Sequence, residues 1–526
     1  MPLEFTIPSH LGADEILSEI RNRISYCDDS ARTVRRTYYD SFDWRLYSND
    51  AVLEEDSDDK GPHALIWRPL NGNKPPARIA LSRPVHFAAD LPSGEFRNRL
   101  ERILEMRELI PLARILSRTR TLRILNRDEK TVARLVVEEN SLPQQKGTRS
   151  RELDRRARVI PVKGYPKPCK KVVGILEDLG LSAAADDLLQ TAMAVLGKTP
   201  GDYTSKLDLQ LDPGMRADQA IRIILHRLLD IMIANEAGVR AGRDTEFLHD
   251  FRVAVRRTRS ALTQIKGVLP ARVLARYKAD FAWLGQATSP LRDVDVYLLK
   301  FDDYRDSLPA SMRGHIEPLR EFLLRHQQIE HRKLVKVLNS ARYRRLLDGW
   351  RNFLEQPVSE RSTLKNARRP VLEVSCQRIW RVYQRILREG NAISADSPAT
   401  ALHELRKTGK KLRYLMEFFQ SLFPEGKIRE LIRELKTLQD NLGDFQDYEV
   451  QVAALKQFGQ QMVDEDSVPA ETLLAMGMLI DGLERRQHGA REEFAGRFAN
   501  FALPKNQDKF RKLFTGCGTA LRESGL

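Results

Sequence analysis

A histidine followed by a row of basic residues occurs twice in the second half of the chain. The first set is His249, Arg252, Arg256, Arg257 and Arg259. The second set is His403, Arg406, Lys410, Lys411 and Arg413. Arginine offers a planar fork of donors to phosphate, lysine a mobile positive charge, and histidine a donor that depends on its protonation. These residue types at this spacing indicate a site for a row of anionic oxygens, such as those of a linear polyanion.

The two sets are related by a single offset in the numbering (403 − 249 = 154), which we call the repeat offset. The same offset continues without a gap, pairing Leu291 with Phe445 and Asp293 with Asp447. A register kept over about 50 residues is typical of an internal repeat. It predicts a duplicated helical bundle with approximate two-fold symmetry.

On an α-helix, the histidine and three of the basic residues of each set fall within an arc of about 80° and span about 15 Å. We define the first basic stripe as His249, Arg252, Arg256 and Arg259. The second basic stripe is His403, Arg406, Lys410 and Arg413. Two such stripes facing each other would line a basic cavity. Polyanion binding there would weaken steeply with salt, because counterions are released on binding.

A simpler interpretation of each stripe is a solvated helix face. In that case Arg259 and Asp293, or Arg413 and Asp447, would pair between neighbouring helices. Neither histidine has a second His, Cys or carboxylate three or four residues onward, so the sequence predicts no metal site and no other cofactor.

The charge distribution agrees with polyanion binding. The 526 residues contain 87 Lys and Arg against 72 Asp and Glu, a net charge of +15. Residues 251–400 hold 29 basic and 15 acidic residues, a net of +14 (29 − 15), so one middle segment carries nearly all of the excess. The segment 401–450, which contains the second stripe, is neutral with 9 of each sign.

Residues 1–165 contain short runs that alternate apolar and polar side chains, as strands with one buried face do. The predicted strands include 35–42, 63–69, 120–125 and 130–138. Helical spacing appears at 12–22, at about 95–110 and at 169–197. Residues 1–200 are therefore predicted to form an α+β domain with an antiparallel β-barrel or tunnel-like sheet.

From residue 216 the apolar residues recur at helical intervals, which predicts an all-α second half. We expect a linker at 201–215, a helical domain at 216–500 and a C-terminal helical tail at 501–526. The predicted helices include 217–238, 245–268, 398–422, 425–441 and 445–458.

At its repeated motifs the chain resembles the CHAD family, the conserved-histidine α-helical domain. The resemblance rests on His-x-x-Arg-x-x-x-Arg-Arg-x-Arg at 249–259, on the matching motif at 403–414 and on LQDNLGDFQD at 438–447. It covers about 216–500. It implies two helical bundles around a basic cavity that binds inorganic polyphosphate, with the phosphate contacts made by the two sets of residues named above.

The N-terminal half resembles the CYTH, or triphosphate tunnel, family through TYYDSFDWRLYSNDAVL at 37–53. Members that hydrolyse triphosphate use a Glu-x-Glu-x-Lys strand, of which PLEFTIP keeps only Glu4. Acidic LEEDSDD at 53–59 stands where the family has an Arg-x-Arg pair. The resemblance leaves a residual set of candidate tunnel residues: Arg68, Arg118, Arg120, Arg134 and Glu138. A metal-dependent hydrolase needs several converging carboxylates, so we expect no catalytic residues here.

These patterns predict a non-enzymatic polyphosphate-binding protein. The alternatives are a metal-dependent triphosphatase in the N-terminal tunnel and nucleic-acid binding by the basic surface. Nucleic acid is the less favoured ligand, because no aromatic-interleaved platform for stacking bases is present. No membrane span is expected, which favours the cytoplasm. The family resemblance adds polyphosphate granules as a location and granule-associated proteins as partners. The four cysteines, Cys27, Cys169, Cys376 and Cys517, are predicted to be reduced thiols.

Overall fold

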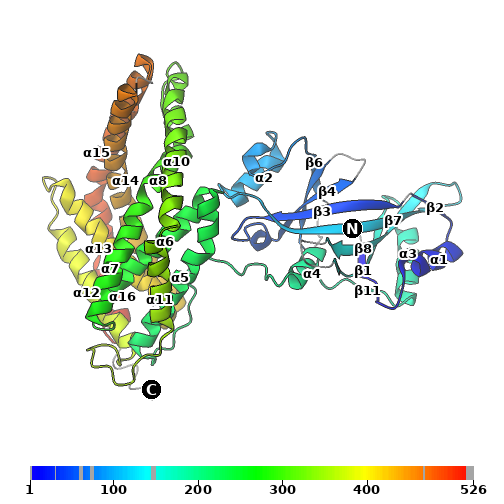
Figure 1. Cartoon of the computed structure of the whole chain (residues 1–526), viewed down its shortest axis with the longest axis horizontal. Coiled ribbons are helices and arrows are strands. Elements are labelled where there is room, and N and C mark those ends of the chain that lie inside the picture. The colour runs from blue at the N-terminus through cyan, green and yellow to red at the C-terminus, as the bar shows by residue number, and fades with distance from the viewer. Residues whose placement is uncertain are drawn as a thin grey trace. The chain divides into compact units, whose positions relative to one another are not determined.

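The computed structural model describes residues 3–29, 31–58, 63–70, 76–143, 150–465 and 468–516. The chain divides into two compact units, Met1–Thr204 and Ser205–Leu526, each considered by itself (Figure 1). Within the described residues, none of the helices combines the length and apolarity that crossing a bilayer requires.

The N-terminal unit is built on one antiparallel sheet. The strands are β1 (Leu3–Thr6), β2 (Tyr26–Asp28), β3 (Arg32–Asp40), β4 (Ala51–Asp58), β5 (Ala64–Pro69), β6 (Ala77–Ala80), β7 (Ile110–Leu125), β8 (Thr131–Leu142), β9 (Arg151–Glu152), β10 (Arg156–Pro161) and β11 (Ser182–Ala183). Their order is β11-β1-β10-β8-β7-β3-β4-β5-β6, with β2 beside β7 and β9 beside β8. The predicted α+β unit with an antiparallel sheet is confirmed. The acidic segment at 53–59 lies on β4 up to Asp58, and Asp59 falls outside the described residues.

Helices cover both faces of this sheet. On one face, α1 (Ala13–Arg23) and α3 (Pro166–Asp178) bury Ile16 and Val172 against Leu135 and its neighbours. Further along the sheet, α2 (Glu95–Leu104) packs Leu100 against β4 and β5. On the other face, α4 (Leu188–Val195) packs against Tyr38, Val52 and Ile115. Short 3₁₀ turns lie at Tyr47–Asn49 and Ala88–Asp90.

The second unit is all-helical, as predicted. Its first half contains α5 (Ala217–Ala241), α6 (Thr245–Gln264), α7 (Ala271–Ala287), α8 (Ser289–Leu299), α9 (Phe301–Ser307), α10 (Glu317–Leu338, preceded by a 3₁₀ turn at Arg313–Ile316) and α11 (Ala341–Glu355). Its second half contains α12 (Val371–Asn391), α13 (Ala399–Phe418), a 3₁₀ turn at Gln420–Leu422, α14 (Glu425–Asp464), α15 (Ala470–Phe501) and α16 (Pro504–Phe514). The long helices α14 and α15 run side by side (Figure 1).

The internal repeat extends to the helix boundaries. The starts of α5 and α12 are separated by the repeat offset (371 − 217 = 154), and so are those of α6 and α13 (399 − 245 = 154) and of α7 and α14 (425 − 271 = 154). Arg216 and Pro370, which the repeat offset also relates, form an antiparallel β-bridge. Across it, the amide of Ala217 donates to Arg369 O at 2.9 Å and that of Val371 donates to Met215 O at 2.8 Å. The repeat offset relates the two donors (217 + 154 = 371) and the two acceptors (215 + 154 = 369), so each bond is the repeat equivalent of the other. The approximate two-fold axis therefore passes through this bridge.

The separate helices predicted at 425–441 and 445–458 are wrong, because α14 is continuous from Glu425 to Asp464. In the first repeat the chain does break, at Thr288 between α7 and α8, and Pro290 lies in the first turn of α8. Proline lacks the backbone N–H donor that a helix interior needs, so it favours a new helix start. The equivalent residue of the second repeat is Asp444 (290 + 154), which keeps its backbone N–H and allows the helix to continue.

The two repeats share a core. Tyr297 of α8, Phe322 of α10, Leu455 of α14 and Met476 of α15 belong to one buried apolar cluster.

Cys376 of α12 is disulfide-bonded, which corrects the prediction of four reduced thiols. Spacing along the chain does not report which cysteines meet in space. Cys27 and Cys169 are free, and Cys517 lies outside the described residues.

Candidate functional site

The local sequence of α6 fixes the orientation of the first stripe. Asp244 caps the helix by accepting hydrogen bonds from the amides of Glu246 and Phe247 at 2.9 and 3.2 Å. The apolar positions that follow, such as Phe251 and Val255, are fully buried. The stripe therefore borders the packed face of α6, and its basic side chains emerge beside neighbouring helices.

The first stripe is held by α7 and α8. Nη1 of Arg252 donates to Gly285 O at 3.1 Å and to Thr288 Oγ1 at 2.7 Å, and its Nη2 donates to Ser289 Oγ at 3.2 Å. Burial, followed by the positive charges of Arg256, Arg292 and Arg259, lowers the pKa of Arg252 to about 10, although Asp293 opposes this. Nη2 of Arg292 lies 2.9 Å from Nδ1 of His249.

The second stripe has the same relationship to α14. Nη2 of Arg406 donates to Asp447 Oδ1 at 2.9 Å, and Nδ1 of His403 is hydrogen-bonded to Oε1 of Gln446. Burial lowers the pKa of Lys410 to about 8, and the positive charges of Arg406, Arg256 and Arg413 add to this effect. The lowered pKa of Lys410 therefore reflects burial first and the neighbouring cations second.

The two stripes meet where α6 packs against α13. Nε of Arg256 donates to the hydroxyl of Tyr414 at 2.7 Å. Nη2 of Arg257, the next residue on α6, donates to Oε2 of Glu417 at 2.9 Å, one turn beyond Tyr414 on α13. Arg256 therefore contributes positive charge to both stripes, since it lowers the pKa of Arg252 in its own repeat and of Lys410 in the other.

The remaining predicted residues have separate surroundings. Nη1 of Arg259 lies against Gly285, 2.9 Å from where a Cβ would stand at that position. Arg413 lies 3.5 Å from Glu417 and 5.6 Å from the centroid of the Tyr414 ring. Lys411 lies beside the stripe and faces α12, where burial and then Arg385 lower its pKa.

In the N-terminal unit, a cluster of charges fills the sheet face covered by α4. Glu138 is 2% exposed, with Oε1 2.6 Å from Arg158 and 3.7 Å from Arg36. Burial alone would raise the pKa of Glu138, but the two arginines outweigh it and hold the pKa below its usual value. Asp56 pairs with Arg36 at 3.0 Å, so the carboxylates and arginines of this face compensate one another.

Arg68 belongs to the same cluster. It pairs with Glu54 at 3.2 Å and with Asp187, the capping residue of α4, at 2.6 Å. Burial opposes its charge, yet these carboxylates keep the pKa of Arg68 above its usual value. Glu4, the remnant of the expected strand motif, pairs with Arg156 at 3.0 Å.

The sheet register separates the other tunnel candidates. Thr119 lies opposite Glu138, so the side chains of Arg118 and Arg120 point to the other face of the sheet. There Arg120 pairs with Asp14 of α1. Arg134 shares the face of Glu138 but lies four residues away on β8 and is exposed. The structure thus brings together only Arg68 and Glu138 from this set.

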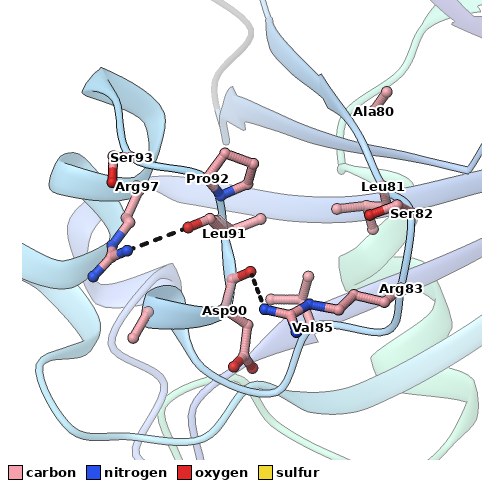
Figure 2. Close-up of a pocket in the computed structure, with 11 residues that line it drawn as sticks. Ala80, Leu81, Ser82, Arg83, Val85, Asp90, Leu91, Pro92, Ser93 and Arg97 are labelled. Carbon is pink, nitrogen blue, oxygen red and sulfur yellow. Dashed lines mark hydrogen bonds between the residues drawn. The ribbon is translucent and has the colours of Figure 1, made fainter.

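Two surface pockets of the structure are not lined by the predicted site residues. One, of about 440 Å³, lies in the loop between β6 and α2. Its two arginines are hydrogen-bonded to backbone carbonyls of the loop (Figure 2). Arg83 donates to Asp90 O at 3.2 Å and Arg97 donates to Leu91 O at 3.4 Å. The other, of about 420 Å³, lies between α14 and α15 and is lined by residues such as Asp444 and Glu493.

The repeated helices agree with a known family. The family model described as the CHAD domain matches residues 223–456, which include both stripes and the helices that hold them. Residues 223–456 form a CHAD domain.

Individual relatives match parts of the chain. An uncharacterized protein of Mycobacterium tuberculosis is 27% identical over 276 residues, which is 50% of this chain and 51% of that protein. The chain thus spans about half the length of the curated relatives it matches. The solved CHAD domain from the plant Ricinus communis is 26% identical, with a TM-score of 0.47, and covers 56% of this chain and 95% of that one. A putative adenylyl cyclase from Hippeastrum, whose structure is described as revealing a dominant triphosphatase activity, is 12% identical with a TM-score of 0.28 and covers 39% and 99%.

Within the CHAD domain, the structure corrects the acid–base pairs that belong to the solvated-face interpretation of the stripes. Asp447 pairs with Arg406 and not with Arg413. In the first repeat, burial raises the pKa of Asp293. The positive charge that most opposes this rise is that of Arg252, not Arg259. The residues one position earlier were missed entirely. Arg292 and Gln446, which the repeat offset relates (446 − 292 = 154), each hold the histidine of their repeat. The offset relates them to each other, but it does not link either residue to its histidine.

Proposed function

We propose that the CHAD domain binds inorganic polyphosphate, without hydrolysing it, through the two basic stripes. The observation that carries the proposal is the meeting of the stripes at Arg256, Lys410 and their neighbours. The lowered pKa values of Arg252 and Lys410 both have other cations of the stripes among their causes. A bound polyanion would relieve that repulsion, which makes the same arrangement favourable once phosphates are present.

The shape of the ligand follows from the stripes. Each extends about 15 Å along its helix, and they share a junction at the contact between Arg256 and Tyr414. Several donors in a row suit a chain of phosphates better than a single one. Arginines can bind phosphate oxygens in a bidentate manner, and Lys410 adds a mobile charge.

The test is retention of long-chain polyphosphate by the immobilised full-length protein as salt increases. The fourfold variant R256Q/R259Q/K410Q/R413Q should lose retention by at least tenfold while its helical circular dichroism is unchanged. A matched control removes four exposed basic residues from α10 and α11, in R332Q/K336Q/R344Q/R345Q, with the same loss of charge. Equal retention by the two variants would contradict the proposal.

Two comparisons address the alternatives. Single-stranded RNA at matched phosphate concentration should compete less well than polyphosphate, since contacts to phosphate alone do not use the bases. The triphosphatase alternative places the chemistry in the N-terminal unit, where Glu4, Glu54 and Glu138 each pair with an arginine. We expect no phosphate release from tripolyphosphate with Mg²⁺ or Mn²⁺ above a buffer blank. Release that is lost on substituting Glu138 would favour the alternative.

A further inference from the structure

The two stripe histidines occupy equivalent positions but have chemically opposite partners. Nδ1 of His249 faces the guanidinium of Arg292, with Nη2 at 2.9 Å. Nδ1 of His403 faces the amide oxygen Oε1 of Gln446. Arg292 and Gln446 are themselves related by the repeat offset, so one substitution between the repeats has changed the group that holds the ring.

Each partner fixes where its histidine carries a proton. A guanidinium has donors and no acceptor, so Nδ1 of His249 must accept and the ring proton lies on Nε2. The orientation of the Gln446 amide is set separately, because its Nε2 donates to Glu449 Oε2 at 3.1 Å. Oε1 of Gln446 therefore accepts from Nδ1 of His403, and neutral His403 has a lone pair on Nε2.

We propose that the two histidines are held in opposite tautomers and therefore contact phosphate differently. His249 donates its Nε2–H to a phosphate oxygen as a neutral ring. His403 donates from Nε2 only after taking up a second proton, so the second repeat couples polyanion binding to proton uptake. This inference rests on the proposed function and adds to it a pH dependence that belongs to one repeat.

The two rings have equivalent acids nearby but different hydrogen-bond partners. Near His249, Glu246 and Asp250 are on the same helix and Asp293 is on α8, while Arg292 and Arg252 carry positive charge. A second proton on His249 would displace the hydrogen bond that Arg292 donates to Nδ1. Near His403, Glu404 is on the same helix, and Asp447 and Glu449 are on α14. Arg406 and Lys407 oppose these acids, but Arg406 is paired with Asp447 and Lys407 with Glu404. Arg385 and Glu389 of α12 lie near Lys411, which is two turns beyond His403 on α13.

The tautomers can be measured without any ligand. Full-length protein labelled with ¹⁵N-histidine gives long-range ¹H–¹⁵N correlations that distinguish Nδ1–H from Nε2–H rings, with His249→Gln and His403→Gln variants assigning the signals. At pH 8, His249 should show protonated Nε2 and His403 protonated Nδ1. R292Q and Q446R should each reverse the tautomer of their own histidine. The same tautomer at both positions would overturn the inference.

The binding consequence is measured with long-chain polyphosphate between pH 5.5 and 7, below the range in which Lys410, with a pKa of about 8, loses its proton. Affinity should rise as the pH falls through the range where histidine ordinarily titrates, by up to tenfold per pH unit for one coupled proton. His403→Gln supplies an N–H donor at every pH and should remove this dependence, whereas His249→Gln should keep it. Dependence unchanged in His403→Gln would overturn the coupling. Opposite tautomers together with no binding at any pH would instead contradict the proposed function and support the tautomer assignment.

Discussion

The guanidinium of Arg406 donates to Oδ1 of Asp447 at 2.9 Å, so one cation of the second stripe already has an anion of the protein beside it. In the first repeat, the equivalent Arg252 is satisfied by Gly285 O and Thr288 Oγ1. The two stripes therefore differ in how far they are neutralised before any ligand binds. Asp447 is 54% exposed, which leaves it free to move away when phosphate approaches.

Replacing Asp447 with asparagine should therefore tighten polyphosphate binding. One more cation becomes available, so at pH 7 we expect a several-fold gain in affinity and a salt dependence steeper by about one charge. The measurement is a binding titration at several salt concentrations. Asp440→Asn makes the same charge change two turns earlier on α14 and serves as the control. Weaker binding by Asp447→Asn would mean that the carboxylate orients Arg406 instead of competing for it.

Lys410 should take up a proton when polyphosphate binds near pH 8. Its pKa of about 8 in the unliganded protein is set by burial and neighbouring cations, and a polyanion would raise that pKa. The charged form is then favoured in the complex, so affinity should fall by roughly tenfold between pH 7 and 9. Calorimetry in buffers of different ionisation enthalpy measures the proton. Lys410→Arg stays charged and should bind without this uptake, whereas equal uptake in the variant would assign the proton elsewhere.

Packing between α12 and α15 depends on a glycine. A Cβ at Gly390 would overlap the ring of Phe498, which is 6% exposed. Gly390→Ala should therefore destabilise the helical unit by about 1–3 kcal/mol. Gly482 on α15 has open space around its Cβ position, so Gly482→Ala should stabilise by up to about 1 kcal/mol through helix propensity. Urea unfolding of both variants decides the matter, and a neutral or stabilising effect of Gly390→Ala would contradict this packing.

The repeat and the stripes could be predicted from sequence because each depends on spacing alone. The repeat offset relates the motifs, and the helix starts at Ala217 and Val371 keep it. The partners of the histidines could not be predicted in this way. Arg292 and Gln446 lie 43 residues beyond the histidines they hold, on another helix, and only Gln446 offers a hydrogen-bond acceptor.

The N-terminal candidates show a second limit of the sequence. Strand alternation places Arg118 and Arg120 on the same face as each other, but only the pairing of Thr119 with Glu138 shows that this face is not the charged one. Register between two strands depends on the turn that joins them and on which faces are buried, and alternation within one strand gives neither. The sequence showed Glu54 and Asp56 as acidic residues where the resembled family has basic ones, and in the structure Arg68 and Arg36 pair with them.

Glu138 should be a major source of stability in the N-terminal unit. Replacing it with glutamine leaves Arg36 and Arg158 without their shared carboxylate in a buried setting, which should cost about 3–5 kcal/mol. Because the pKa of Glu138 is lowered on folding, its contribution is present above its usual pKa of 4.5 and is lost as the pH falls below that value. The gap between wild type and Glu138→Gln should therefore shrink on acidification. Hydrogen exchange of the β8 amides measures the gap, and Glu139→Gln, on the opposite face of the same strand, should change it by less than about 0.5 kcal/mol. Equal effects of the two variants would show that the charge cluster does not stabilise this sheet.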